Sequence, residues 1–85
     1  MLDAKHPDGF VRLISEFGWI NEGIWKNGDR NGWGREILSN GSYVVGFWKD
    51  GCLHGNCRKY NKDGTIKEEG LYKYNKHFGE FKTDQ

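Results

Sequence analysis

The glycines of this 85-residue chain recur at a constant interval of 23 residues. Three such sets can be followed along the sequence: Gly9, Gly32 and Gly55; Gly18, Gly41 and Gly64; and Gly23 and Gly46. In the last set a tryptophan follows two residues after each glycine, and Gly70 with Tyr72 repeats this pattern one residue late. A constant period of this length predicts an array of one small supersecondary unit, in which each copy packs against its neighbours.

Composition limits the classes of protein that fit. The chain is long enough for one domain, but its hydrophobic content of 35% leaves little material for a compact core. A net charge of +1 disfavours general affinity for nucleic acid, and we expect no nucleic-acid partner. No apolar run reaches the roughly 18 residues of a membrane-spanning helix. Two cysteines are too few for a disulfide scaffold, and we expect a cytoplasmic protein.

Each period contains two extended segments rich in aromatic and β-branched residues, as expected of strands. One kind reads FVRLI, WGREIL, NCRKY and EFK, and the other reads WINEGIWK, SYVVGFWK and TIKEEGLYK. No segment shows helical periodicity. The sequence therefore predicts an all-β fold, a single-sheet antiparallel β-hairpin meander or solenoid of about three and a half 23-residue repeats.

Glycine marks the connections between these segments. SNG and KDG end in a glycine that we expect at positive φ. NGDRNG, DGCLHG and YNKHFG are predicted to be longer connections. The extra residue at Glu68–Glu69 predicts a β-bulge. We divide the chain into a flexible N-terminal segment (1–8, where Pro7 discourages pairing), a repeat domain (9–82) and a C-terminal tail (83–85).

Stacking the repeats aligns equivalent residues in columns on the two faces of the sheet, because side chains alternate along a strand. One face is expected to carry Trp25, Trp48 and Tyr72, and the other Ile24, Phe47 and Leu71. Gly23, Gly46 and Gly70 precede the aromatic column by two residues, which leaves room over the backbone for a neighbouring ring. A further structural set, at the bends, comprises Gly32, Gly55 and Gly79.

The pattern G-x-W-x-x-G-x-x-x-G-x-G, in Gly23–Gly34, resembles the MORN (membrane occupation and recognition nexus) repeat. The next unit, Gly46–Cys57, fits except for its last residue, and Gly70–Gly79 is similar to the divergent variant common in bacterial proteins. Where the family usually carries tyrosine, this chain has Asn21 and Val44. The resemblance covers about residues 9–81. It implies an elongated, twisted sheet of hairpins that scaffolds, dimerises or docks onto proteins, often in cytoskeletal or ciliary assemblies.

The two apolar columns are the first candidate site, for another protein or for a second copy of the chain. A single sheet with apolar side chains on both faces has nothing of its own to cover both, and contiguous apolar patches mark interaction sites. The alternative for Trp25, Trp48 and Tyr72 is that they form the internal packing of the repeats.

Two basic columns are the second candidate site, for anionic phospholipid headgroups. The residues are Arg12, Arg35 and Arg58 in one column and Lys26, Lys49 and Lys73 in the other. The near-zero net charge favours the alternative, in which these side chains pair with Glu22, Glu36, Glu68 or Glu69 on adjacent strands.

The remaining candidates carry less weight. Cys52, His54 and Cys57 form C-x-H-x-x-C without an evident fourth ligand, so we expect neither a metal nor a cofactor. No catalytic constellation is recognisable. We expect a non-catalytic interaction or scaffolding module, with a peripheral membrane module and the regulatory repeat region of a larger enzyme as alternatives. A choline-binding repeat fits less well, because each unit has too few aromatic residues to form a cage.

Overall fold

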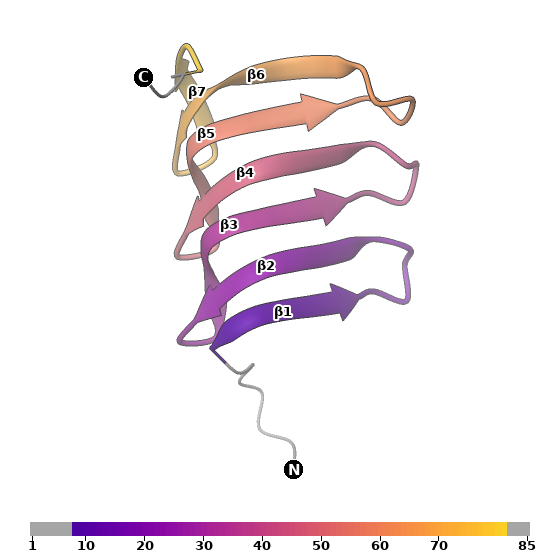
Figure 1. The fold of residues 1–85 in the computed structure, drawn as a ribbon, viewed down its shortest axis with the longest axis vertical. Coiled ribbons are helices and arrows are strands. Elements are labelled where there is room, and N and C mark those ends of the chain that lie inside the picture. Colours follow the sequence, from indigo (N-terminus) through magenta and orange to yellow (C-terminus); the bar gives the residue numbers. More distant parts are fainter. Residues whose placement is uncertain (1–7, 82–85) are drawn as a thin grey trace.

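The chain forms one open antiparallel sheet of seven strands that follow one another in sequence order (Figure 1). The computed structural model describes residues 8–81, and these contain strands and turns but no helix. The strands are β1 (Gly9–Ile14), β2 (Ile20–Lys26), β3 (Asp29–Ile37), β4 (Tyr43–Lys49), β5 (Cys52–Tyr60), β6 (Ile66–Lys73) and β7 (Lys76–Gly79). The predicted all-β meander is confirmed. Of the predicted division, residues 1–7 of the flexible segment at 1–8, Lys82 of the repeat domain and the tail at 83–85 lie outside the described residues.

The connections at one side of the sheet are three similar turns closed by glycine. Gly18, Gly41 and Gly64 each have φ of +94°, and the amide of each donates to the carbonyl three residues earlier, as in Gly41 N to Leu38 O at 2.9 Å. This is a type I turn followed by a left-handed residue, in which glycine avoids the steric cost of positive φ. The expectation for SNG and KDG is therefore confirmed.

The connections at the other side are two-residue turns, where longer loops were expected. Positive φ at both central residues, in Asn27–Gly28, Asp50–Gly51 and Tyr74–Asn75, is the signature of the type I′ hairpin. DRNG and CLHG consequently belong to β3 and β5. The prediction was wrong because the last glycine of each connection was taken for a turn residue, whereas Gly32, Gly55 and Gly79 lie within strands.

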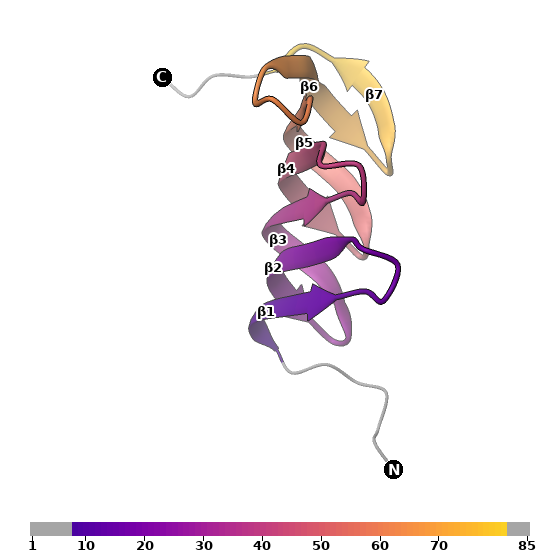
Figure 2. The same cartoon turned by 90° about the vertical axis from the view of Figure 1, so that its right-hand side faces the viewer.

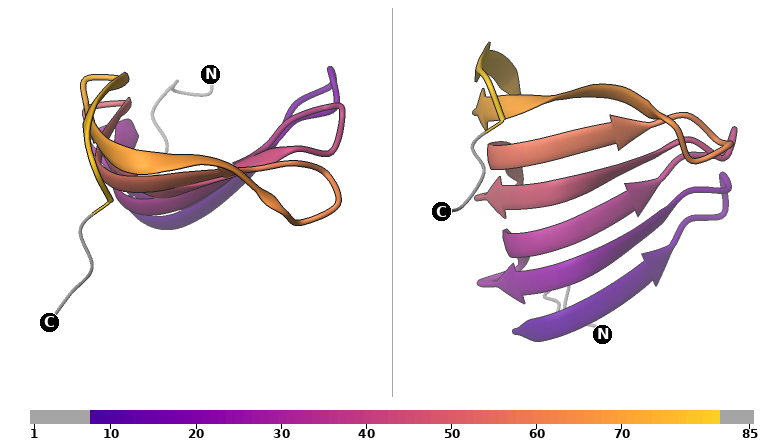
Figure 3. Two further views of the ribbon diagram at one scale, coloured as in Figure 1. Left: turned by 90° about the horizontal axis from the view of Figure 1, so that it is seen from above. Right: turned by 45° about the horizontal axis from the view of Figure 1, so that its top comes forward.

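Gly32 and Gly55 mark irregularities that bend the long strands. The β2–β3 register shifts between Gly23 and Trp25, and the β4–β5 register shifts between Gly46 and Trp48. The extra residues lie on β3 and β5, where Gly32 and Gly55 have φ of +119° and +112°. Such bulges bend a strand and increase its twist. The tight-turn ends of the hairpins accordingly rise from the floor of the sheet (Figure 3).

Two further expectations concern the last strands. The bulge expected at Glu68–Glu69 is present one residue earlier, because Lys59 pairs with Glu68 whereas Tyr60 pairs with Ile66, which leaves Lys67 extra. The strand expected at EFK is wrong. The last strand within residues 8–81 is β7, and Glu80 and Phe81, which follow it, are outside any strand.

Neighbouring hairpins are also joined through their tight turns. Gly51 N donates to Arg30 O and Asn75 N donates to Leu53 O, both at 3.0 Å. Side chains 23 residues apart add equivalent links, because Asp8 Oδ1 accepts from Asn27 N at 2.9 Å and Asn31 Oδ1 accepts from Asp50 N at 3.1 Å. These bonds hold the rising turns in a row along the long axis, beside strands stacked in a single layer (Figure 2).

Small residues form a continuous row across the middle of the sheet. In register order the row is Val11, Gly23, Gly34, Gly46, Cys57 and Gly70. A Cβ added at Gly23 would lie 2.6 Å from Gly34 Cα, and one at Gly46 would lie 2.7 Å from Cys57 Cα. Such distances are too short for real side chains, so the row allows backbones and bulky groups to approach closely. Rings occupy the space over two members, Trp48 over Gly34 and His77 over Gly70.

Replacing Gly46 by alanine tests the importance of this row. The added methyl group would meet Cys57 and the Asn56 carbonyl oxygen, and overpacking of this kind costs about 1–3 kcal/mol. We expect the melting temperature to fall by roughly 4–8 °C per kcal/mol for a domain of this size. Gly79→Ala is the matched control, because its φ is also not positive and its nearest contact would be an ordinary 3.5 Å. Equal losses in the two variants would show that the close approach at Gly46 is unimportant.

Candidate interaction surface

The column Trp25, Trp48 and Tyr72 is buried against the sheet. Their exposed fractions are 8%, 5% and 2%, and Val11 and Cys57 are buried beside them on what we call the inner face. A single layer can bury rings to this extent only inside its own bend, so the inner face is the concave one. This burial favours internal packing for the three rings, and we do not retain them as contacts for a partner.

Polar side chains cover the inner aromatic residues. The Arg30 guanidinium lies 4.9 Å from the Trp48 ring centroid, donates to Asn21 Oδ1 at 3.2 Å and pairs with Glu36 at 3.5 Å. A cation over an aromatic face is attracted by the electron density of the ring. Asn21, which stands where the MORN pattern has tyrosine, is therefore part of this packing.

A second polar group covers Tyr72. Lys59 Nζ lies 5.2 Å from the ring centroid, and the His77 ring stacks on it at 5.2 Å between centroids. Glu68 lies within ion-pair distance of both, at 3.6 Å from Lys59 and 3.5 Å from His77. The inner face thus covers these rings with its own side chains and offers no open apolar surface there.

The opposite, outer face leaves a row of large apolar side chains in contact with solvent. Phe10 lies opposite Ile24 across β1–β2, and Trp33 lies opposite Phe47 across β3–β4. Their exposed fractions are 63% for Phe10, 38% for Ile24, 40% for Trp33 and 47% for Phe47. With Leu71 on β6, they form what we call the outer apolar row. Exposure of several large apolar side chains on one face is typical of an interaction surface.

Bulge glycines hold the outer apolar row in place. A Cβ added at Gly32 would lie 3.1 Å from Ile24 Cβ, one at Gly55 would lie 3.4 Å from Phe47 Cβ, and one at Gly79 would lie 3.5 Å from Leu71 Cδ1. Ile24, Phe47 and Leu71 each therefore lie over a glycine of the following strand. The predicted outer column and the predicted bend glycines prove to be partners in packing.

A charged row runs beside the outer apolar row. Glu22 lies between Arg12 and Arg35 across three strands, at 3.1 Å and 2.6 Å, and Arg58 pairs with Glu69 at 2.8 Å. The glutamate at Glu69 raises the pKa of Arg58 through its hydrogen bond. The three arginines are thus paired across strands, as the alternative interpretation of the sequence anticipated. Exposed pairs of this kind stabilise little individually, but their row sets strand register.

Beyond the charged row lies a second line of apolar residues. It consists of Ile14, Ile20, Ile37, Tyr43, Tyr60 and Ile66 in consecutive register. Tyr43 and Tyr60 stack with their ring centroids 4.7 Å apart. The outer face therefore alternates apolar, charged and apolar lines across the strands.

A shallow cavity of about 210 Å³ lies beside the outer apolar row. Its lining includes Trp33, Phe47, Asn56, Arg58, Tyr60 and Phe81. Phe81, which follows β7, lies with its ring 4.2 Å from the Arg58 guanidinium carbon. The sequence pattern did not indicate the surface positions of Phe10, Trp33 and Phe81. Phe10 and Trp33 are 23 residues apart and each follows a bulge-position glycine, which is the signal that would have found them.

The other candidate residues are separated from one another. Lys26, Lys49 and Lys73 are exposed next to the tight turns, and none of the ion pairs found within residues 8–81 involves them. Cys57 is fully buried, and burial raises the pKa of its thiol, whereas Cys52 is partly exposed. The His54 ring packs edge-on against Tyr74 at 5.1 Å. No three potential metal ligands come together in the described part of the chain.

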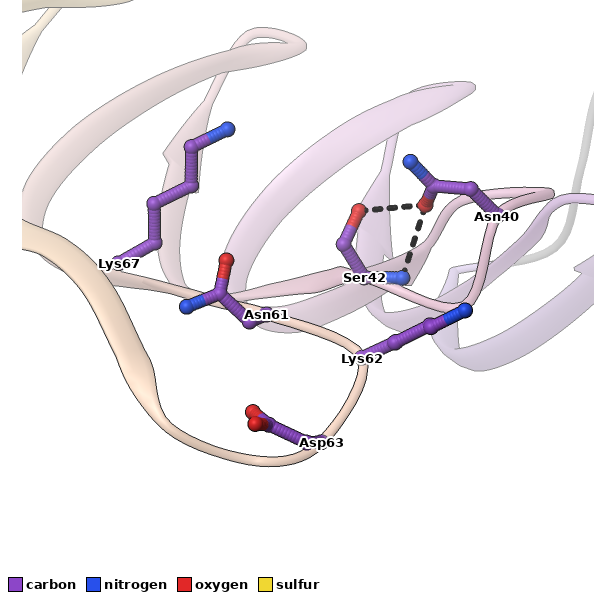
Figure 4. A pocket seen from close by; sticks show the side chains of 6 residues that line it. All are labelled: Asn40, Ser42, Asn61, Lys62, Asp63 and Lys67. Carbon is purple, nitrogen blue, oxygen red and sulfur yellow. Dashed lines mark hydrogen bonds between the residues drawn. The ribbon is translucent and has the colours of Figure 1, made fainter.

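A polar pocket of about 460 Å³ lies between two of the glycine-closed turns (Figure 4). Asn40, Ser42, Asn61, Lys62, Asp63 and Lys67 line it. Asn40 Oδ1 accepts from Ser42 N and Ser42 Oγ, and Asp63 Oδ1 accepts from the amide and hydroxyl of Thr65, which lowers the pKa of Asp63. These groups stabilise their own turns.

Comparison with known proteins gives no assignment, since neither a protein-family model nor a curated protein matches the chain. Residues 8–81 contain no helix that is long and apolar enough to cross a membrane.

Because the Tyr72 ring is buried, we expect the stability of the folded protein to fall at alkaline pH. Burial, with the nearby Glu68 carboxylate, raises the pKa of Tyr72 from 10.0 to about 12. Because the folded state favours the protonated phenol, its contribution is complete below pH 10 and is lost as the pH rises towards 12. We expect the free energy of unfolding, measured by urea titration, to fall across this window. The fall should be smaller in Tyr72→Phe than in Tyr74→Phe, which changes an exposed tyrosine. Identical pH profiles for the two variants would contradict the assignment.

Proposed function

We propose that this chain is a non-catalytic protein-interaction or scaffolding module that binds through its outer face. The observation that supports it is the outer apolar row: large apolar side chains stand exposed on one side of a single sheet, while the inner face is packed internally. Fully covering such a row would contribute about 25 cal/mol per Å² of apolar area removed from water. A protein surface is the partner that best suits it, because aromatic residues concentrate binding energy at interfaces.

The hairpin period and its resemblance to MORN repeats agree with this proposal. We infer from the resemblance that the chain acts in the cytoplasm, within a cytoskeletal or ciliary assembly. The outer face alternates apolar and ion-paired lines, and this alternation also favours a protein partner. The ion-paired row between the two apolar lines would set the register of docking, since charges complementary to it favour one orientation. If the chain is the repeat region of a larger enzyme, the same face would dock that enzyme's other parts.

A matched pair of variants tests the proposal. Trp33→Ser combined with Phe47→Ser removes two aromatic contacts from the outer apolar row, whereas Phe17→Ser removes an equally large side chain that is 73% exposed in a turn. Each variant, once shown to retain the wild-type circular dichroism spectrum, is used to capture proteins from the native source. We expect the double variant to retain its partner at least about tenfold less well, since hot-spot losses exceed 1.4 kcal/mol, and Phe17→Ser to match the wild type. Equal capture by all three proteins would refute docking on this face.

The alternative of anionic phospholipid binding has one supporting feature, the exposed row Lys26, Lys49 and Lys73. The arginine column does not add to it, because Arg12, Arg35 and Arg58 are engaged by glutamates. Three lysines attract an anionic surface by about 1 kcal/mol each, which gives weak binding that salt screens.

Flotation with phosphoinositide-containing vesicles separates the two functions. We expect little or no binding at physiological salt and weak binding at low salt. Lys26→Glu combined with Lys49→Glu should abolish the low-salt signal without changing the capture of a protein partner. Robust flotation at physiological salt that the lysine variant abolishes would make the membrane the principal partner.

A further inference from the structure

We propose that β1 is an edge for self-association, at which two copies of the chain pair their β1 strands antiparallel about a two-fold axis. The result would be one continuous sheet of twice seven strands. The proposal goes beyond docking on the outer face, since it uses backbone groups at the sheet edge and does not require the outer apolar row to be occupied.

The backbone of β1 presents hydrogen-bonding groups along its open side. Ser15 N donates to Trp19 O at 2.8 Å, so this pair lies in the hydrogen-bonded position of the β1–β2 ladder. Because such positions alternate along antiparallel strands, Leu13 and Val11 also bond to β2. The amides and carbonyls of Phe10, Arg12 and Ile14 therefore point away from β2, and no strand within residues 8–81 pairs with them.

This edge lacks the devices that usually prevent strand pairing. β1 contains neither proline nor a bulge, and its register with β2 is regular over six residues. Its one charged residue, Arg12, is paired with Glu22. The side chains beside it are among the most exposed on the strands, Phe10 at 63% and Ile14 at 68%. The opposite edge, β7, is four residues long and its register with β6 is irregular.

The number of strands determines the symmetry. In an antiparallel meander of seven strands, the first and the last run in the same direction. Adding β1 of one copy to β7 of the next by simple repetition would therefore give a parallel pair. Antiparallel pairing that keeps the same face outward in both copies requires a two-fold axis and joins like edges, here β1 to β1. Such a pairing closes as a dimer instead of extending into a filament.

The outward-pointing residues also define the register. Pairing centred on Arg12 places Phe10 opposite Ile14 of the second copy on the outer face and Val11 opposite its Leu13 on the inner face. The exposed side chains of Phe10 and Ile14 thereby cover one another on the outer face, which favours cross-strand pairing. Arg12 lies opposite its own counterpart, a repulsion that each Glu22 reduces. We therefore expect association to strengthen as salt rises.

Two substitutions of Arg12 distinguish the contribution of its backbone amide from that of its side chain. Arg12→Thr and Arg12→Pro both remove the ion pair with Glu22, but only proline also removes the outward amide. That amide makes no bond to β2, so the fold should tolerate the change. In sedimentation velocity across a concentration series, we expect a wild-type dimer, an Arg12→Thr dimer at least as tight, and an Arg12→Pro dissociation constant at least about tenfold weaker.

Amide exchange of the wild type provides a measurement that requires no variant. Protection of the Phe10, Arg12 and Ile14 amides should increase with protein concentration, whereas protection of Val11 and Leu13 should not. A wild type that remains monomeric at millimolar concentration, or a dimer unaffected by Arg12→Pro, would overturn the proposal. Loss of the dimer in the Trp33→Ser, Phe47→Ser variant would also overturn it, by assigning association to the outer face. Because dimerisation and partner capture respond to different substitutions, the two proposals fail independently.

Discussion

The close approach of backbones along the small-residue row is the constraint on which the rest of this structure depends. A single sheet has no second layer to cover its rings, so it must bend over them. The row Val11, Gly23, Gly34, Gly46, Cys57 and Gly70 permits this, because side chains at Gly23 or Gly46 would collide with the next strand. Trp25, Trp48 and Tyr72 then fit inside the bend. The bulges at Gly32 and Gly55 supply the curvature that closes it.

The two faces differ because the bend protects one of them only. On the inner face, Arg30 and Lys59 lie over aromatic rings and are paired with acids, so the polar side chains of the same sheet cover the rings. On the outer face, Ile24 and Phe47 gain contact with the bulge glycines beneath them but keep much of their surface in water. The bulge glycines therefore help to bury the inner aromatic column and leave the outer apolar column exposed. An apolar outer row is a geometric consequence of this construction, and a partner can use it.

The sequence was sufficient for the architecture because period and alternation are local properties. Glycine spacing predicted the antiparallel meander, and two-residue alternation placed Trp25 and Ile24 on opposite faces. The prediction failed where one connection contains two glycines. Asn27–Gly28 forms the type I′ turn, but the turn was predicted to extend to Gly32. Which apolar column is buried also lay beyond the sequence. Both columns have the same period, and the direction of bending depends on bulges whose offsets emerge only in the paired strands.

The edges of the sheet follow from the same repetition. An interior strand of the β1 type, such as β3, is flanked on both sides by strands that carry the buried aromatic residue. Within residues 8–81, β1 has such a neighbour on one side alone. Every interaction that links one hairpin to the next is consequently left half complete at an end of the array. The Arg35–Glu22–Arg12 sequence of charges stops at Arg12, and the outer apolar row stops at Phe10. Solenoid-like arrays resolve such ends with a polar cap or with another chain. The apolar, regularly paired β1 has the character of the second case, which is why we propose association at this edge as well as on the outer face.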